Sequence, residues 1–586
     1  MSGAIQRIWL LLLAGLLPAL SAGAQVLRLE VAPVWEKSEL KSNHWQPEGS
    51  PAGLSVNRLD FLLSKLALRR ADGSWLESED WHRFLSLEKG LLTAEAEGLP
   101  KEDFTGIRFQ VGVPPKENAG DAAQWPPAHA LNPEVCGLHW GWQGGYVFMA
   151  LEGRWRRADG QLGGFSYHIA NDENLTTVEL PVDFRGGGPV TIRLALDAAV
   201  LLGGMDFVRD GDSTHSRARD PLLVKLTGNL ARAFRAQSVS YDLFQSPAVT
   251  EKAAPPPPGT TPFHLAVTQR FPQAALPADN PLTKEGVELG ERLFHDTRLS
   301  INNTQSCAGC HSRANALTDP RRVSLGAQGQ AGKRNAMPLF NLAWAREFFW
   351  DGRAKTLREQ VLMPIQDAHE MNETLENVVA KLADASAEFD RAFGPGGVTT
   401  ERLAKALEQF LLSQISQNSR FDRAARKVAE LTQEEKRGLQ LFVTEYDPAR
   451  GLFGADCFHC HGGTLFTDHQ FKNNGLDLEP ADRGRMLVTG NAADKGKFKT
   501  PSLRNIAVTA PYMHDGRFAT LEEVVEHYSG PMPRSDTLDP NLAKHPDAGI
   551  QLSAADKRAL VAFLKTLTDD DFITAPDGEV TQTNAP

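Results

Sequence analysis

SCAGCHSRAN (Ser306–Asn315) and DCFHCHGGTL (Asp456–Leu465) share one pattern: a cysteine, two residues, a second cysteine and a histidine. In an exported protein this spacing is typical of a covalently attached c-type haem. Both thiols bond the porphyrin edge, and the histidine binds the iron from one side. The attachment residues are therefore predicted to be Cys307, Cys310 and His311 for haem 1, and Cys457, Cys460 and His461 for haem 2.

Two other kinds of site also contain a pair of cysteines at this spacing: a redox dithiol and one half of a zinc site. A dithiol does not require the histidine, and zinc usually requires a second cysteine pair or a spaced histidine pair. The surroundings of the motifs favour haem. GERLF begins at Gly290 ahead of the first motif, and GLQLF begins at Gly438 ahead of the second. This repeat predicts two copies of one helical module, each carrying one haem.

Hydrophobic periodicity divides the chain into two kinds of structure. Near the C-terminus, LSAADKRALVAFLKTL places Leu560, Leu564 and Leu567 on one stripe behind a serine N-cap, which predicts a helix. Near the N-terminus, VLRLEV alternates apolar and charged residues, which predicts a half-buried strand. The predicted fold is a β-sandwich-like domain followed by a mostly α pair of haem domains.

The run SPAVTEKAAPPPPGTTP separates the two kinds of structure and predicts a stiff, extended linker. At the N-terminus, Arg7, a short apolar run and small residues indicate a secretory signal cleaved after Ala24, with no other stretch apolar enough to span a membrane. The predicted domains are a signal peptide (1–24), a β domain (25–245), the linker (246–262), the haem 1 domain (263–430), the haem 2 domain (431–571) and a disordered tail (572–586).

Charge and cysteine usage exclude several classes of protein. The formal net charge of −11 argues against binding to nucleic acid. Four of the five cysteines belong to the haem motifs, so a disulfide framework is excluded. The fifth, Cys136, is interpreted as a buried thiol, with a soft copper ligand as the alternative.

The residue on the open side of each iron decides its function. A histidine or methionine there gives a closed electron-transfer haem, whereas an open side admits peroxide. The loop from Ser312 to Arg334 contains neither residue, so haem 1 is predicted to be the reactive haem.

Two longer stretches, FWDGRAKTLREQVLMPIQDAHEM and KTPSLRNIAVTAPYMHDGRFATLEEVVEHY, together with the two haem motifs, resemble the di-haem cytochrome c peroxidase family and its MauG-like branch. The resemblance covers about Pro262 to Asp570 and implies two haems with a calcium ion between the domains. It implies that Trp350 lies between the haems, that Gln360, Pro364 and Glu370 form the distal pocket of haem 1 with Glu370 as its acid/base, and that Asn335, Thr509 and Pro511 bind calcium.

The position fourteen residues after His514 separates the branches of this family. Peroxidases that accept electrons from a cytochrome have a methionine there, whereas this chain has Tyr528, as MauG-like proteins do. Tyr528 is therefore the expected second ligand of haem 2, and a phenolate favours higher iron oxidation states. Met513 and Met532 are the alternative ligands.

The front half, in NPEVCGLHWGWQGGYVFMALEG, GGFSYHIAND and DGDSTHSRARDPLLVKLTGNLARAF, resembles the copper-binding MbnP family. In that family histidines hold copper, and a tryptophan is oxidised to kynurenine by a separate MauG-like enzyme of the MbnH type. The resemblance implies His168 and His215 as copper ligands, with His44 and His139 in reserve. The candidates for the oxidised residue are Trp140 and Trp142.

The resulting hypothesis is a periplasmic di-haem oxidase of a Gram-negative bacterium. Hydrogen peroxide would be its oxidant, and its own N-terminal domain, or that of a second copy, its protein substrate. A small c-type cytochrome or a cupredoxin is a possible electron donor. One alternative is an ordinary peroxidase that reduces hydrogen peroxide, and a second is a non-catalytic copper-binding or redox-delivery protein.

Overall fold

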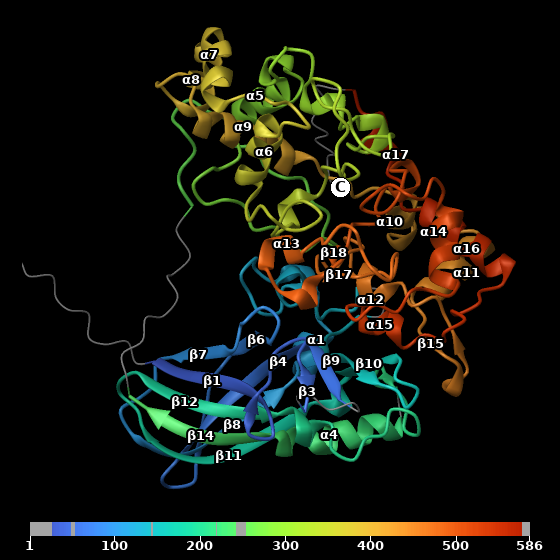
Figure 1. Cartoon of the computed structure of the whole chain (residues 1–586). Coiled ribbons are helices and arrows are strands. Elements are labelled where there is room, and N and C mark those ends of the chain that lie inside the picture. The colour runs from blue at the N-terminus through green and yellow to red at the C-terminus, as the bar shows by residue number, and fades with distance from the viewer. Residues whose placement is uncertain (1–25, 48–52, 142–143, 218, 242–252, 577–586) are drawn as a thin grey trace, which may run out of the picture.

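The computed structural model describes residues 26–47, 53–141, 144–217, 219–241 and 253–576. It has three units. The β domain lies at the bottom of Figure 1 in blue to green, the haem 1 module at the top in green and yellow, and the haem 2 module between and to the right of them in orange and red. The predicted signal peptide falls outside the described residues. Within them, no helix is long and apolar enough to cross a membrane.

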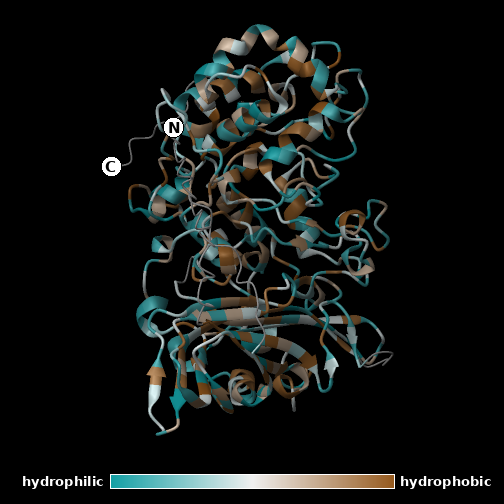
Figure 2. Ribbon diagram, turned by 90° about the vertical axis from the view of Figure 1, so that its left-hand side faces the viewer, coloured by the Kyte–Doolittle hydropathy of each residue, from teal (hydrophilic) through white to brown (hydrophobic). Residues whose placement is uncertain are grey.

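The β domain is built from two sheets that share one hydrophobic core. In β1, Leu27, Leu29 and Val31 are buried while the residues between them are half-buried, so the predicted alternation is confirmed. The smaller sheet has the order β14-β12-β1-β2 with β7 added to β1, and the larger has the order β11-β8-β4-β9-β10-β13 with β3, β5 and β6 added to β4. The two layers are visible at the bottom of Figure 2.

The elements of the β domain are short apart from β4 and α4. They are β1 (Val26–Trp35), β2 (Ser38–Glu39), β3 (Trp45–Gln46), β4 (Leu54–Arg70), β5 (Trp75–Glu77), β6 (His82–Ser86), β7 (Thr93–Glu97), β8 (Asp103–Val111), α1 (Pro115–Asn118), α2 (Pro133–Cys136), β9 (Val147–Arg156), β10 (Leu162–Ala170), β11 (Thr176–Arg185), β12 (Val190–Asp197), α3 (Ala198–Leu201), β13 (Ser213–Thr214), α4 (Pro221–Ala233) and β14 (Phe234–Ser240).

The haem modules are mostly helical, as predicted. The haem 1 module contains α5 (Lys284–Phe294), α6 (Leu357–Gln366), α7 (Leu375–Lys381), α8 (Ser386–Phe393) and α9 (Thr400–Ser413), followed by α10 (Arg420–Ala425). The haem 2 module contains α11 (Gln433–Phe442), β15 (Tyr446–Asp447), β16 (Leu452–Phe453), α12 (Phe458–His461), β17 (Phe471–Lys472), α13 (Met486–Thr489), β18 (Phe498–Lys499), α14 (Leu521–Ser529), α15 (Pro540–Ala543) and α16 (Ala554–Lys565).

The internal repeat is visible in the way each module packs its first helix. Gly290 of α5 lies so close to α9 that a Cβ there would meet the Ala406 carbonyl oxygen at 2.0 Å. Gly438 of α11 has the same relation to α16, where a Cβ would meet the Ala559 carbonyl oxygen at 2.0 Å. In both modules glycine permits two helix backbones to approach closely.

A second repeat fixes the register between the modules. Trp350-Asp351-Gly352-Arg353 precedes α6, and His514-Asp515-Gly516-Arg517 precedes α14. Both helices begin with a capping box, Thr356 with Glu359 and Thr520 with Glu523. Counting from these threonines, Pro364 in α6 and Tyr528 in α14 occupy the same position.

The β domain packs against the haem 2 module. Asn541 of α15 donates from Nδ2 to Glu152 Oε2 at 3.1 Å, and Arg450 donates to the Ser213 carbonyl at 2.8 Å. The strand β10 approaches α15 so closely that a Cβ on Gly164 would meet the Pro540 carbonyl oxygen at 1.9 Å. The interface between the β domain and the haem 2 module therefore contains a buried hydrogen bond and a close backbone approach that requires glycine at position 164.

The chain enters the haem modules along the haem 1 module. The described part of the predicted linker, from Ala253, pairs with that module through Ala254 N–H to the Ala278 carbonyl at 2.7 Å. The predicted start of the disordered tail was wrong, because α17 (Asp570–Thr574) continues the fold and Phe572 is buried in the haem 1 core. Its buried ring stands edge-on to Phe340 with the ring centroids 5.7 Å apart and lies under the Arg313 guanidinium, and these contacts extend the order past residue 571.

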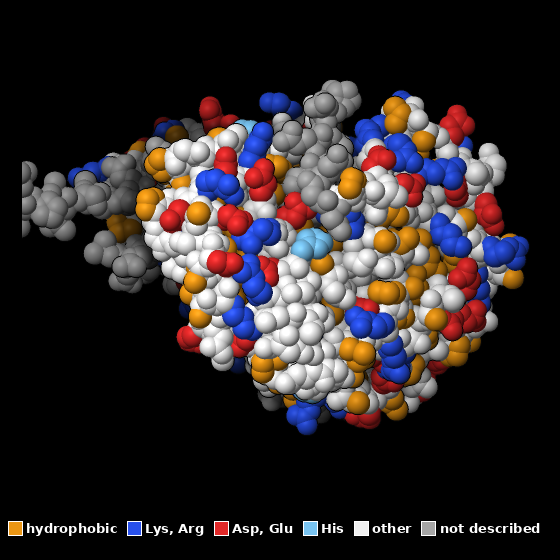
Figure 3. Space-filling view, turned by 90° about the horizontal axis from the view of Figure 1, so that it is seen from above, with side chains coloured by type: hydrophobic (Ala, Val, Ile, Leu, Met, Phe, Trp, Pro, Cys, Tyr) orange, Lys and Arg blue, Asp and Glu red, His pale blue; other side chains and the backbone are white. Residues whose placement is uncertain are grey.

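Figure 3 views the molecule from the haem 1 end. Lysine and arginine side chains are interspersed with aspartate and glutamate, and apolar side chains are scattered among them. This face therefore carries no single-sign field that would select a strongly charged partner.

Candidate functional site

The first haem motif opens onto a cavity of about 770 Å³ in the haem 1 module. His311 donates from Nδ1 to the Leu317 carbonyl at 2.8 Å, which leaves Nε2 free to bind iron. The cavity is lined by both cysteines of the motif and by every haem 1 residue that the resemblance implied: Trp350, Gln360, Pro364 and Glu370.

Glu370 is the half-buried carboxyl group of this cavity. Burial first, and the nearby Asp367 charge second, raise its pKa to about 7, and Arg353 opposes the shift. A carboxyl with this pKa both accepts and donates a proton near neutral pH, which suits a general acid/base.

Sequence reasoning missed three donor-bearing residues that line the haem 1 cavity, Met337, His369 and Met371. They lie beyond the loop from Ser312 to Arg334, so the absence of histidine and methionine in that loop gave no information about them. Pro364, which stands where haem 2 has Tyr528, offers no donor atom to iron.

The second haem motif opens onto a narrower cavity of about 210 Å³. His461 faces the Phe466 carbonyl through Nδ1 at 3.2 Å, which repeats the arrangement of His311. Tyr528 lines this cavity and its hydroxyl accepts from Asn474 Nδ2 at 3.2 Å. Met513 lines it too, and its sulfur lies 3.3 Å from the same Asn474 nitrogen. Met532 is not among the residues that line it.

Trp350 lines both haem cavities. Its indole nitrogen donates to the Asn335 carbonyl at 2.8 Å, and Asn335 also lines both cavities. Thr509 and Pro511 line the haem 2 cavity as well, so the three residues implied for calcium share the lining of one cavity. Hard oxygen donors of this kind suit that ion.

The two histidines implied for copper also meet, and they meet a third. The ring centroids of His168 and His215 lie 4.6 Å apart, and His459 lies 4.9 Å from His215 and 5.7 Å from His168. One nitrogen from each lies within 4.8 Å of the other two. His459 stands inside the haem 2 motif, between Cys457 and Cys460, where sequence reasoning assigned it no role.

Acidic groups surround the three histidines. His168 Nε2 lies 3.0 Å from Glu152 Oε1, and His215 Nδ1 lies 2.9 Å from Glu445 Oε2. Asp456 contacts His459 at 3.3 Å. The ammonium group of Lys544 lies between the last two carboxylates, 3.0 Å from Glu445 and 3.2 Å from Asp456.

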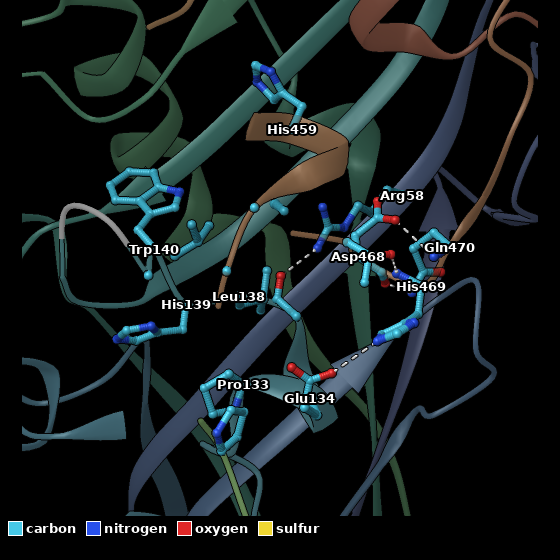
Figure 4. A pocket seen from close by; sticks show the side chains of 18 of the residues that line it. Arg58, Pro133, Glu134, Leu138, His139, Trp140, His459, Asp468, His469 and Gln470 are labelled. Atoms are coloured by element: carbon cyan, nitrogen blue, oxygen red, sulfur yellow. Dashed lines mark hydrogen bonds and ion pairs between the residues drawn. The ribbon is translucent and has the colours of Figure 1, made fainter. Parts of the chain in front are cut away.

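Trp140 lies beside this cluster. It is buried, and its ring centroid is 6.3 Å from that of His215. Figure 4 shows Trp140 from the β domain and His459 from α12 beside a cavity of about 1060 Å³ between the domains. Trp142 lies outside the described residues.

The remaining candidates of the β domain lie apart from the cluster. His44 is exposed, and the His139 ring stands edge-on to Tyr146 at 4.8 Å. Cys136 is buried and its burial raises the thiol pKa to about 11, which fits an inert core residue.

The two cysteine pairs are free thiols, each histidine of a motif has its Nδ1 occupied, and each motif opens onto a cavity. These residues fit two covalent haems.

Comparison with known proteins agrees with this geometry. The di-haem cytochrome c peroxidase family matches residues 284–430, and the MbnP family matches residues 24–216. The methylamine utilization protein MauG of Methylophilus methylotrophus is 34% identical over 295 residues, covering 50% of this chain and 84% of that protein. Cytochrome c551 peroxidase of Nitrosomonas europaea is 35% identical over 308 residues, covering 51% and 84%.

Among solved structures, a MauG-like protein associated with microbial copper homeostasis is 35% identical with a TM-score of 0.50, and the match covers 54% of this chain and 99% of that one. Each of these relatives matches about half of this chain. The chain therefore belongs to the di-haem cytochrome c peroxidase family that includes MauG, an oxidoreductase family with two c-type haems that uses hydrogen peroxide, and it carries an MbnP domain in front.

Proposed function

We propose that this di-haem peroxidase oxidises a tryptophan of its own β domain, Trp140, to kynurenine. The carrying observation is the contact between the Trp140 loop and the haem 2 attachment loop. A Cβ on Gly141 would lie 3.1 Å from Gly463 Cα, two residues beyond His461. The β domain thus presents its tryptophan to the haem 2 module.

The reaction balances with two molecules of peroxide. Together they remove four electrons, cleave the C2–C3 bond of the indole and leave two oxygen atoms as N-formylkynurenine, with release of two waters. Hydrolysis then removes the formyl carbon as formate. The net change is one carbon lost and one oxygen gained, a mass increase of about 4 Da.

The two haems, when bound, supply peroxide reduction and hold the oxidising equivalents. Glu370 takes a proton from the incoming peroxide and returns it to the departing oxygen, which its pKa of about 7 permits. Trp350 lines both haem cavities and provides the aromatic contact between them. Asn335, Thr509 and Pro511 hold a calcium ion near this contact and keep the two modules in register.

The β domain is proposed to bind copper through His168 and His215, since imidazole suits copper in either oxidation state. Kynurenine would add a carbonyl and an aniline next to this pair. We further propose export to the periplasm, with a small c-type cytochrome or a cupredoxin as the electron donor. The fused β domain, or that of a second copy, is the protein substrate.

One observation favours the simpler peroxidase, which would only reduce peroxide. Met513 lines the haem 2 cavity with Tyr528 and shares its Asn474 contact, so a methionine ligand is available. Non-catalytic copper delivery has less support, because an electron-transfer haem has no use for the raised pKa of Glu370.

Intact-mass and peptide mass spectrometry of the full di-haem protein, with and without peroxide, tests the proposal. We expect a peptide containing Trp140 to gain about 4 Da in the wild type. Trp140→Phe removes that signal, and Trp350→Phe suppresses it while leaving haem content unchanged. An unmodified Trp140 after peroxide treatment would reduce the function to peroxide consumption alone.

A mixing experiment distinguishes modification of Trp140 within one chain from modification of Trp140 in a second copy. A peroxide-active Trp140→Phe chain is incubated with a haem 1-inactive chain that retains Trp140. Modification of the inactive chain shows that a second copy serves as substrate.

A further inference from the structure

His459 occupies a position in the haem 2 motif that haem attachment does not require. The equivalent position in the haem 1 motif is Gly309, so the motif does not need a side chain at this position. In haem 2 the imidazole is 99% buried and faces the β domain instead of the haem cavity: its Nε2 lies 2.9 Å from His215 Nε2.

Hydrogen-bond partners fix which nitrogen of each ring carries the proton. His215 Nδ1 faces the Glu445 carboxylate at 2.9 Å, and His459 Nδ1 faces the carbonyl of Asp456 at 3.4 Å and its carboxylate at 3.3 Å. These oxygens accept hydrogen bonds, so in a neutral ring Nδ1 carries the hydrogen and Nε2 carries the lone pair. Two lone pairs therefore point at each other across 2.9 Å.

The third histidine contributes an orphaned nitrogen. His168 is 5% exposed, and its Nε2 is engaged by Glu152 Oε1 at 3.0 Å. Its Nδ1 is buried and has no hydrogen-bond partner. A buried polar atom without a partner is costly, and such atoms call for a ligand.

A metal ion between the rings would bind both facing lone pairs, and one nitrogen of His168 lies within 4.8 Å of them. Two nitrogens 2.9 Å apart can both lie within a metal–nitrogen bond length of about 2.0–2.1 Å of one ion. The carboxylates behind the rings are the outer partners that orient histidine ligands. Glu445 and Asp456 with Lys544 contribute a net charge of −1, which complements a cation.

Copper is the ion that this donor set selects. Three neutral imidazoles without a thiolate or a coordinating water shell do not suit Mg²⁺ or Ca²⁺, and copper heads the affinity order of first-row divalent metals at nitrogen sites. Cu⁺ is also stable with three nitrogen ligands, whereas a catalytic zinc centre keeps an open position for water.

We propose that His459, inside the haem 2 attachment sequence, is the third ligand of a copper ion held by His168 and His215, so that the ion bridges the β domain and the haem 2 module. This inference rests on the proposed copper binding by the β domain. It adds that the site is complete only when the domains are docked. It also adds that one ligand of the ion, His459, is the residue directly before Cys460, which attaches haem 2.

The consequence is coupling between copper and haem. A cation added beside haem 2 stabilises its reduced form, because the extra positive charge offsets the electron gained by iron. Copper also ties two domains that the chain joins at a distance, through the haem 1 module. Loss of the ion is therefore expected to loosen the docked β domain.

Copper titration of the metal-stripped, di-haem full chain tests the site, with CuSO₄ and with Cu⁺ held by a competing chelator as probes. We expect one copper per chain and Cu²⁺ EPR hyperfine structure from three nitrogens. His168→Ala, His215→Ala and His459→Ala should each weaken binding by about 100-fold or more, and Glu445→Gln by about 10–100-fold. His44→Ala, an exposed histidine outside the cluster, is the matched control and should bind as wild type.

His459→Gly introduces the residue that the haem 1 motif has at this position. It is the second variant in case His459→Ala fails to attach haem 2. The pyridine haem spectrum measures haem content in both variants. The second readout is the midpoint potential of haem 2, which should rise on copper loading in the wild type and stay constant in the His459 variants. Limited proteolysis between the domains should be slowed by copper in the wild type alone.

The outcomes distinguish failure of the bridging site at His459 from failure of copper binding by the β domain. If the His459 variants keep wild-type copper affinity and EPR while His168→Ala loses both, copper stays within the β domain and the bridging site is wrong. If His168→Ala and His215→Ala also bind as wild type, the proposed copper function fails with it. Tighter binding of ZnSO₄ than of either copper probe overturns the choice of metal.

Discussion

The two haem modules repeat several local features around their haem motifs and differ in the side chains at key positions. Both pack a glycine against the partner helix, both hold the motif histidine through a backbone carbonyl, and both begin a later helix, α6 or α14, with a capping box. Where α6 has Pro364, α14 has Tyr528, and where the first motif has Gly309, the second has His459. One fold thus supports a haem module with an open cavity and one that is closed and contacts a partner domain.

The difference in cavity size follows from these side chains. The haem 1 cavity of about 770 Å³ keeps a polar group, Glu370, and a proline where a ligand would stand. The haem 2 cavity of about 210 Å³ contains Tyr528 and Met513. We therefore propose peroxide chemistry at haem 1, where Glu370 lines the cavity and Pro364 stands at the position of a ligand, whereas haem 2 lies beside the β domain.

Glu370→Gln tests the chemistry of the larger cavity and should have the largest effect. Removing a positioned general acid/base typically costs about 10²–10⁴ in rate. Because burial raises the pKa to about 7, the wild-type peroxide reaction should speed up as pH rises through 7 and the carboxylate forms. Stopped-flow spectra over a pH series measure both effects.

In the Glu370→Gln variant the peroxide reaction should be slow, and its rate should no longer increase as pH rises through 7. Asp367→Asn, which removes the neighbouring negative charge, is the matched control: it should shift this increase to lower pH and keep the rate. A wild-type rate in Glu370→Gln would remove this side chain from the mechanism.

Tyr528→Met tests the difference between the modules at the ligand position. In the resting ferric wild type, EPR should show one high-spin centre from haem 1 and one low-spin centre from haem 2. A thioether donates less charge than a phenolate, so the variant should make haem 2 easier to reduce and leave haem 1 unchanged.

Two low-spin signals in the wild type would contradict an open haem 1. In that case Met337→Leu, His369→Ala and Met371→Leu would identify the unforeseen ligand, because the one that restores a high-spin signal supplies it. An unchanged haem 2 potential in Tyr528→Met would instead favour Met513, and Met513→Leu would then change the spectrum.

The paired glycines give the smallest effect and test the repeat itself. Gly290→Ala and Gly438→Ala each place a Cβ within 2.0 Å of a carbonyl oxygen, and overpacking of this kind typically costs ~1–3 kcal/mol of stability. Gly228→Ala, in α4 with no atom within 4 Å of the added Cβ, is the control and should be neutral or slightly stabilising.

Thermal unfolding followed at the haem absorption measures these changes. Gly438→Ala should additionally expose the interdomain region to protease, because the β domain packs against that module. Equal protease sensitivity in both variants would show that docking does not depend on the haem 2 helices.

Much of the fold was predictable because its signals are local. Alternation in VLRLEV marks a strand, and the leucine stripe near the C-terminus marks a helix, since side-chain direction follows from backbone geometry within a few residues. The end of the fold was misplaced because Phe572 is ordered by a contact with Arg313, far away in the chain. No pattern around residue 572 signals that contact.

The sequence by itself determined the two haem attachments, the repeat and the change from strands to helices, because each depends on spacing between neighbouring residues. Only the tertiary structure decided what stands beside what. His215 and His459 meet across 244 positions of sequence, and Gly141, next to Trp140, lies against the haem 2 loop. Pro364 and Tyr528 occupy equivalent positions in the two modules. Such contacts arise when whole domains pack, and burial of their shared surface, not any local periodicity, sets the partners.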